Sequence, residues 1–221
     1  YEDHASEIGK VALYITDHQM NIEAENRFGQ TRPTIPLIAT PNIVTANALR
    51  YDWNELLPAE GCNYVMGNPP FRGKLQQTDD QRTDLSFVCG GLKNFGLLDY
   101  VSAWFVKSSE YMFSNKKVQT AFVATNSICQ GEQVATLWQP LLKQGMSINF
   151  AYRTFQWSNE GKGVAAVHCV IVGFSYSSLE IKHLFSLDAV ARKQTKIVCD
   201  NINPYLTNAP SVIISSNNYI V

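Results

Sequence analysis

Two hydrophobic periods alternate along this chain, and their alternation limits the fold more than any other feature of the sequence. Runs with the β-branched and apolar character of strands lie at residues 62–66, 118–125 and 147–153. Between them, residues 98–113 and 132–144 carry apolar side chains at helical spacing. Strands and helices in this order predict an α/β fold, in which helices wrap a sheet of parallel strands.

The flanking segments extend this pattern. A helix is expected at residues 5–19, then a proline-containing connection at 21–41 and a short strand at 42–46. Residues 72–96 show no clear period, so no regular element is predicted there. The last expected strands, the final ones forming an antiparallel pair, lie at residues 165–175, 181–185 and 196–199.

Composition places the chain among globular proteins and removes several function classes. Apolar residues make up 45% and charged residues 17% of the 221 residues, a balance typical of a packed core. Because 18 Lys and Arg face 19 Asp and Glu, the net charge is -1, so no global positive field attracts a polyanion. No apolar stretch reaches the ~20 residues of a membrane span, and no signal peptide is visible. We therefore expect a cytoplasmic protein without a membrane partner.

Cysteine and histidine are spaced too irregularly for a metal site. The five cysteines lie far apart, without a Cys-x-x-Cys pair, and none has a histidine beside it at ligand spacing. We expect buried free thiols and no bound metal ion.

One tetrapeptide, Asn68-Pro69-Pro70-Phe71, directly follows the strand predicted at 62–66. Its prolines prevent strand or helix from continuing. In an open α/β sheet, ligands collect at the carboxyl ends of strands, which is where this tetrapeptide lies. A rigid turn that buries its aromatic ring is the alternative explanation, since Pro-Pro turns are common and Asn favours turns.

The same residues are suited to activate a planar amino group. The exocyclic amine of a purine is a poor nucleophile because its lone pair is delocalised into the ring. The Asn68 side-chain carbonyl and the Pro69 backbone carbonyl can accept both amino hydrogens, which turns the nitrogen lone pair toward an electrophile. Phe71 offers a ring on which the base can stack. A base inside a duplex would have to be flipped out to reach them.

The tetrapeptide resembles the catalytic motif of class I S-adenosylmethionine-dependent methyltransferases that modify amino nitrogens, chiefly the DNA adenine-N6 enzymes. Further blocks narrow the resemblance to the methyltransferase region of MmeI-like, type IIL restriction-modification proteins. These blocks are residues 47–53 (NALRYDW), 64–74 (YVMGNPPFRGK), 98–101 (LDYV) with Ala103 and Trp104, 122–133 (FVATNSICQGEQ) and 153–168 (RTFQWSNEGKGVAAVH). Together they cover most of residues 8–210, and they imply a Rossmann-like core, a parallel sheet with a terminal antiparallel strand.

The resemblance also implies residue roles. The expected catalytic residues, which we call the clamp, are Asn68, Pro69, Pro70 and Phe71. The residues expected to bind the methyl donor are Asn47, where many members carry Asp, together with Asp52, Asn68 and Asp99. The residues expected to contact the DNA or the flipped base are Phe71, Arg72, Lys74, Phe155 and Trp157.

Several of these assignments have a plainer alternative. Asp99 also fits the start of a helix beside the core. The aromatic pair Phe155 and Trp157 also fits core packing, and Arg72 and Lys74 also fit solvated surface.

The family's donor-binding block, a strand followed by a D-x-x-x-G-x-G turn, is not found, and Gly90-Gly91 stands in the wrong context for it. We therefore expect residues 1–221 to form one partial methyltransferase domain, truncated at its N-terminal side. The donor-binding block and the target-recognition domain would lie elsewhere in the parent protein.

The implied function is a site-specific, adenine-specific DNA methyltransferase of a prokaryotic restriction-modification protein. Its cofactor would be S-adenosylmethionine and its partner double-stranded DNA in the full-length parent, whereas the isolated chain is expected to be inactive. One alternative is a non-catalytic fragment or DNA-binding scaffold of the same fold. Another is an amino-methyltransferase acting on RNA or protein glutamine. The DNA target, cleavage by the parent and the oligomeric state are not specified by the sequence.

Overall fold

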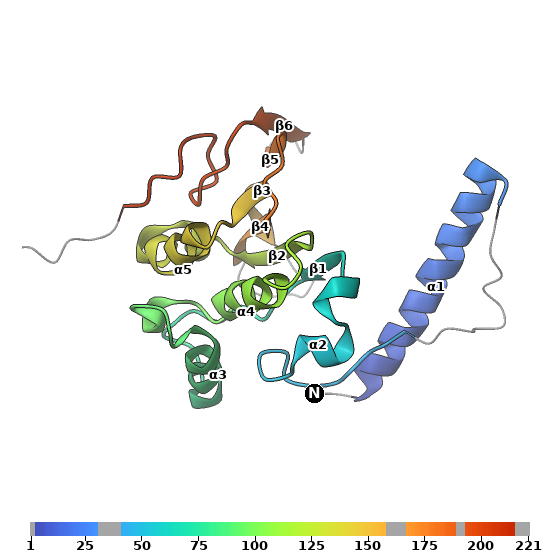
Figure 1. Cartoon of the computed structure of the whole chain (residues 1–221), viewed down its shortest axis with the longest axis horizontal. Helices are drawn as coiled ribbons and strands as arrows, with labels where there is room; N and C mark the ends of the chain where they lie inside the picture. The colour runs from blue at the N-terminus through green and yellow to red at the C-terminus, as the bar shows by residue number, and fades with distance from the viewer. Residues whose placement is uncertain (1–2, 31–40, 158–166, 189–192, 215–221) are drawn as a thin grey trace, which may run out of the picture. The chain divides into compact units, whose positions relative to one another are not determined.

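The chain is described by a computed structural model over residues 3–30, 41–157, 167–188 and 193–214 (Figure 1). It divides into two compact units, Tyr1–Pro58 and Ala59–Val221. The candidate catalytic residues lie in the second unit.

The first unit contains helix α1 (Asp3–Phe28) and the single turn α2 (Trp53–Leu56). Helix α1 confirms the helix predicted at 5–19 and continues through residues that we expected in the connection. It ends at Gly29, whose φ of +66° is in the left-handed region that glycine favours. The strand predicted at 42–46 is wrong, because these residues make no ladder with another strand.

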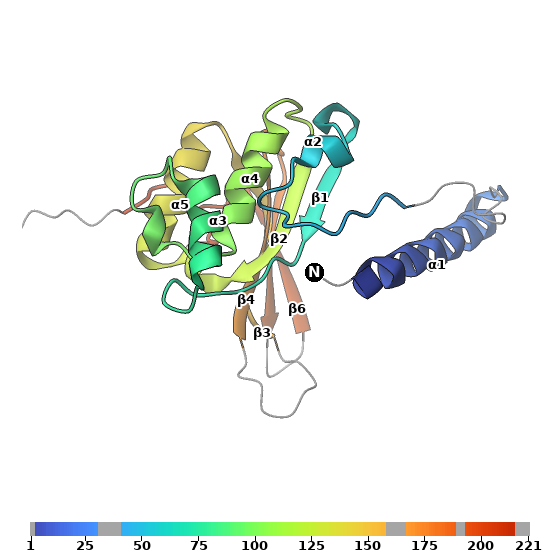
Figure 2. The same cartoon turned by 90° about the horizontal axis from the view of Figure 1, so that it is seen from below.

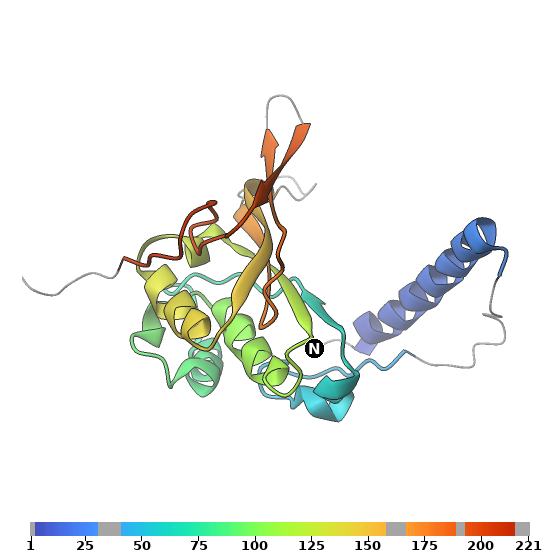
Figure 3. The same cartoon turned by 45° about the horizontal axis from the view of Figure 1, so that its top comes forward.

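The second unit is built on a mixed six-stranded sheet of order β1-β2-β4-β3-β5-β6. Its strands are β1 (Tyr64–Gly67), β2 (Gln119–Thr125), β3 (Ser147–Trp157), β4 (Val167–Ser175), β5 (Lys182–Asp188) and β6 (Lys193–Cys199). Strand β1 is parallel to β2 and β3 is parallel to β5, whereas β4 is antiparallel to both of its neighbours and β6 to β5. The α/β prediction is confirmed, with the antiparallel β4 inserted between β2 and β3. Figure 3 shows the β5–β6 hairpin (orange) at the sheet edge away from β1.

Three helices of this unit lie on the same face of the sheet (Figure 2). They are α3 (Asp79–Cys89), α4 (Ser102–Met112) and α5 (Gly131–Lys143). The core beneath them is centred on Phe105 of α4, whose ring stacks on Phe174 of β4 at 5.2 Å between centroids. Edge contacts join the same ring to Phe122 of β2 and Trp138 of α5. These contacts fix α4 and α5 against β2 and β4.

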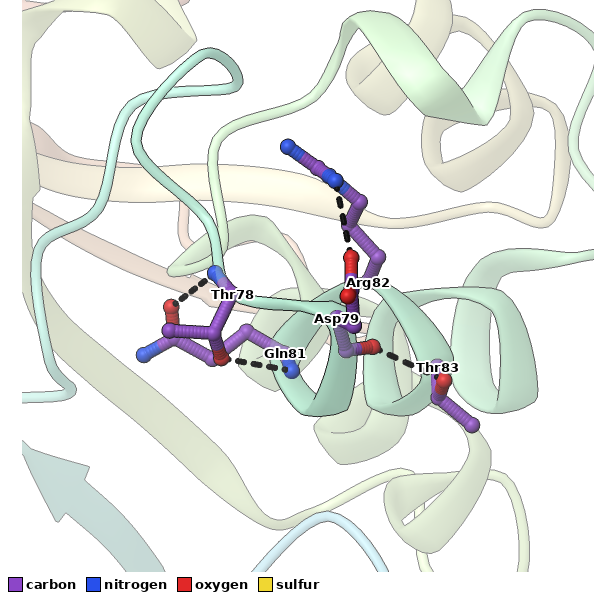
Figure 4. Close-up of polar contacts among 5 residues, drawn as sticks. All are labelled: Thr78, Asp79, Gln81, Arg82 and Thr83. Carbon is purple, nitrogen blue, oxygen red and sulfur yellow. Dashed lines mark hydrogen bonds and ion pairs between the residues drawn. The ribbon is translucent and has the colours of Figure 1, made fainter.

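Helix α3 was not predicted, although its first turn carries a sequence signal. Thr78 and Gln81 form a capping box: the Gln81 N–H donates to Thr78 Oγ1 at 3.3 Å, and the Thr78 N–H donates to Gln81 Oε1 at 3.1 Å (Figure 4). Asp79 adds an acidic residue to the first turn, where the helix dipole favours negative charge.

Candidate functional site

Strands β1, β2 and β3 run in the same direction, because β1 is parallel to β2 and β4 is antiparallel to both β2 and β3. Their carboxyl ends therefore meet at one edge of the sheet. Gly67, Thr125 and Trp157 are the last residues of these strands. The candidate site lies at this edge, as the rule for open α/β sheets predicts.

The clamp follows β1 immediately and lies at the protein surface. Asn68 and Pro70 are exposed, Phe71 is partly exposed and Pro69 is buried. Within the described part of the chain, no residue hydrogen-bonds to the Asn68 side-chain amide. Its carbonyl oxygen is thus available to accept a hydrogen bond from a ligand. A turn formed only to bury the Phe71 ring does not account for an exposed Asn68.

The loop that follows the clamp is attached to the segment 98–100, which precedes α4. The Tyr100 N–H donates to the Arg72 carbonyl at 2.9 Å, and the Lys74 N–H donates to Asp99 Oδ1 at 3.1 Å. The Gln77 side-chain amide donates to the Leu98 carbonyl at 3.0 Å. The side chains of Arg72 and Lys74 are exposed beside the clamp, and the phosphate contacts expected of them stay a prediction.

Asp99 accepts one of these hydrogen bonds and is 6% exposed. Its Oδ2 accepts from the Thr125 hydroxyl at 3.2 Å and also from the Ser127 hydroxyl. Its main-chain N–H donates to Gln133 Oε1 at 3.0 Å. Asp99 lies before α4, which begins at Ser102, and not within its first turn.

These partners of Asp99 were not among the residues predicted for the site. Thr125, Ser127 and Gln133 all fall within the block 122–133, which served only to identify the family. The signal that could have identified them is the pair of hydroxyl side chains at the end of a predicted strand and the amide side chain at the start of the next predicted helix.

Phe155 lies on β3 at the level of the site. It is in register with Cys169 of β4, which is in register with Thr125 of β2. Phe155 is partly buried. Trp157 ends β3, but its side chain and residues 158–166 lie outside the described residues. The role expected for this aromatic pair stays a prediction.

Asn47 and Asp52 belong to the first unit, and their expected role in donor binding stays a prediction. Each has a local structural role. Asn47 Oδ1 accepts from the Leu49 N–H at 3.0 Å, and Asp52 Oδ1 accepts from the Asn54 N–H at 2.9 Å, which caps α2.

All five cysteines are buried free thiols. Burial, with a smaller contribution from Glu110, raises the pKa of Cys89 to about 12. Burial also raises the pKa of Cys129, which lies in the turn after β2. Burial therefore favours the protonated, less reactive form of these two thiols.

The described ranges contain neither a cluster of metal ligands nor a membrane-spanning helix. No group of three or more His, Cys, Asp or Glu side chains is placed there to hold a metal ion. None of the described helices combines the length and the apolar character needed to cross a membrane.

Comparison with known proteins gives consistent matches. The family profile described as "MmeI, DNA-methyltransferase domain" matches residues 1–186. The chain is 42% identical over 218 residues to DNA methyltransferase A of Bacillus subtilis (strain 168), a match that covers 97% of this chain and 24% of that protein. Its fold matches the solved structure of the type IIL restriction-modification enzyme MmeI in complex with DNA with a TM-score of 0.87 and 46% identity, covering 98% of this chain and 29% of that one. The chain thus spans about a quarter of the length of these relatives.

Proposed function

Because this chain belongs to the MmeI DNA-methyltransferase domain family, we propose that its parent transfers a methyl group from S-adenosylmethionine to adenine N6 in DNA. The parent would be a restriction-modification protein that acts on a base flipped out of the duplex. One observation carries this proposal: an exposed Asn68, followed by two prolines and an aromatic ring, stands at the carboxyl end of β1.

The clamp supplies what the chemistry of an amino nitrogen requires. Asn68 Oδ1 and the Pro69 carbonyl oxygen accept the two amino hydrogens, and Phe71 stacks on the base. When bound, S-adenosylmethionine supplies an electrophilic methyl group. The prolines hold the two acceptors in place before the base arrives, so little reorganisation is needed during the reaction.

The donor site would be shared between this chain and other parts of the parent. Asn47, Asp52, Asn68 and Asp99 are our proposed contributors. For Asp99 the contribution is indirect, because both of its carboxylate oxygens accept from protein groups. Gly90-Gly91 follows helix α3 and not a strand, so it does not form the family's donor turn. We therefore propose that the donor-binding block lies elsewhere in the parent and that the isolated chain is inactive.

The DNA site would surround the clamp. Phe71, Phe155 and Trp157 would contact the flipped base, while Arg72 and Lys74 would contact phosphates. Recognition of the DNA sequence around the target base would come from a separate target-recognition domain. That domain would also supply much of the DNA affinity, since the net charge of -1 provides little attraction for DNA here. Because the proposed substrate is cellular DNA, we place the parent in the cytoplasm.

Identification of the product tests this proposal. The full-length parent would be incubated with tritiated S-adenosylmethionine and duplex DNA, and the DNA would then be digested to nucleosides. We expect the label in N6-methyladenosine. Label in another base, in RNA or in a protein glutamine would contradict the assignment, and absence of label in any acceptor would favour the non-catalytic scaffold.

A further inference from the structure

Three segments that lie far apart in the sequence meet at the carboxylate of Asp99. We propose, resting on the function proposed above, that Asp99 is a positioning residue that holds the clamp in the geometry required for methyl transfer. It would do so by joining the loop after β1 to the end of β2, without touching the donor or the base.

The clamp is a short segment held at both ends. On its N-terminal side, Gly67 is in register with Phe122 in the β1–β2 ladder. On its C-terminal side the holding contacts are the Tyr100 N–H to the Arg72 carbonyl and the Lys74 N–H to Asp99 Oδ1. The first side is held by the sheet ladder. The second depends on the segment that carries Asp99.

Burial makes the position of this carboxylate specific. A carboxylate that is 6% exposed is tolerated only where hydrogen bonds replace those it would make to water. Here the donors are the main-chain N–H of Lys74, in the loop that follows the clamp, and the hydroxyls of Thr125 and Ser127. Moving the loop after β1 away from the end of β2 would leave buried polar groups without hydrogen-bond partners, so this junction resists displacement.

Strands β1 and β2 both end at the site, and the Asp99 side chain couples the loop after β1 to the end of β2. Thr125 is the last residue of β2, and Ser127 lies in the turn that follows it. Gln133 extends the coupling to α5 by accepting the Asp99 N–H. A shift of the clamp relative to the base by about 1 Å is enough to cost a large factor in rate. Asp99 would prevent that shift.

Variants of Asp99 in the full-length parent test the proposal. Asp99→Ala removes the junction. Asp99→Asn keeps its shape, because the amide oxygen can accept from the Lys74 N–H and the amide NH2 can donate to the two hydroxyls. Asp84→Asn is the matched control: Asp84 is also a buried acid, and it accepts from the Tyr100 hydroxyl at 3.0 Å, but it lies on α3 and not at the clamp.

Each variant is measured for single-turnover methylation, for the Kd of S-adenosylmethionine, for melting temperature and for flipping of 2-aminopurine placed at the target base. We expect Asp99→Ala to lower the methylation rate about 10- to 100-fold and to reduce the flipped-base fluorescence. The donor Kd should change by less than about threefold, and Asp99→Asn and Asp84→Asn should stay within about threefold of the parent in rate.

Three results would overturn the proposal. One is a donor Kd weakened about tenfold or more by Asp99→Ala with unchanged flipping, which would place Asp99 in the donor pocket. Another is a lower melting temperature with an unchanged rate per folded molecule, which would make its role only structural.

The third result applies if Asp99→Ala does not fold. In that case Ser127→Ala, which removes one of the hydroxyl donors, must lower the methylation rate, and an unchanged rate would reject the coupling. By contrast, a parent that methylates no adenine rejects the proposed function itself.

Discussion

At the scale of single residues, burial separates the polar groups of the site into two kinds. Asn68 is exposed and its amide has no hydrogen-bond partner among the described residues, as a group that binds a ligand requires. Asp99 is buried and bonded to protein donors, as a group that maintains geometry requires. The sequence alone does not distinguish these two environments, because the three partners of the Asp99 carboxylate lie 25, 26 and 28 residues away along the chain.

The thiol of Cys89 gives a prediction at this scale. Its pKa is raised to about 12 by burial, so the reactive thiolate forms only at higher pH than in an ordinary cysteine. Alkylation of the Cys89 peptide by iodoacetamide, followed by mass spectrometry, should be about 10³-fold slower at pH 8 in the native protein than in guanidinium. The native rate should keep rising up to pH 11, whereas the unfolded rate should level off above about pH 9. A native rate that levels off near pH 9 would contradict this environment.

At the scale of elements, the sequence predicted what depends on a periodic apolar face. Strand β2 and helices α4 and α5 were predicted within a few residues, since Phe122, Phe105 and Trp138 lie in strong patterns that meet in one core. Helix α3 was not predicted because it buries only Asp84, Leu85 and Cys89. With an acidic residue on the buried face, the apolar residues do not recur at the spacing that identifies a helix. The position of β4 between β2 and β3 was not visible either, because a strand pattern does not specify its neighbours.

Gly173 of β4 gives a prediction for the packing of two strands. A Cβ at this position would overlap the ring of Phe150, its register partner on β3. Gly173→Ala should therefore lower the free energy of unfolding by about 1–3 kcal/mol in urea denaturation. The same substitution in a Phe150→Ala background should cost clearly less, as a double-mutant cycle would show. Equal costs in the two backgrounds would mean that the ring does not cause the strain.

At the scale of the whole molecule, charge placement matters more than total charge. The net charge is -1, yet Arg72 and Lys74 are exposed beside the clamp. If the proposed phosphate contacts form, positive charge acts locally on the DNA backbone without a basic surface overall. The residues that choose the target sequence and much of the DNA affinity would come from other parts of the parent.

The salt dependence of DNA binding by the full-length parent tests this placement. Replacing Arg72 and Lys74 by Ala should reduce the slope of log K against log salt by about 0.9 for each phosphate that is no longer neutralised. Lys116 and Lys117 are the matched control, because they are exposed just before β2 and hence at the opposite end of the sheet. Their replacement should leave the slope unchanged. Equal slopes for both double variants would reject the phosphate contacts.

The most direct test of the account compares the asparagines at the two ends of β1. Asn63 and Asn68 are both exposed and flank the same strand, but only Asn68 stands at the carboxyl end. In single-turnover methylation by the full-length parent, Asn68→Ala should lower the rate at least about 100-fold with DNA binding retained. Asn63→Ala should stay within about threefold of the parent. Equal methylation by the Asn68→Ala variant and the parent would contradict the central claim that Asn68 activates the amino group.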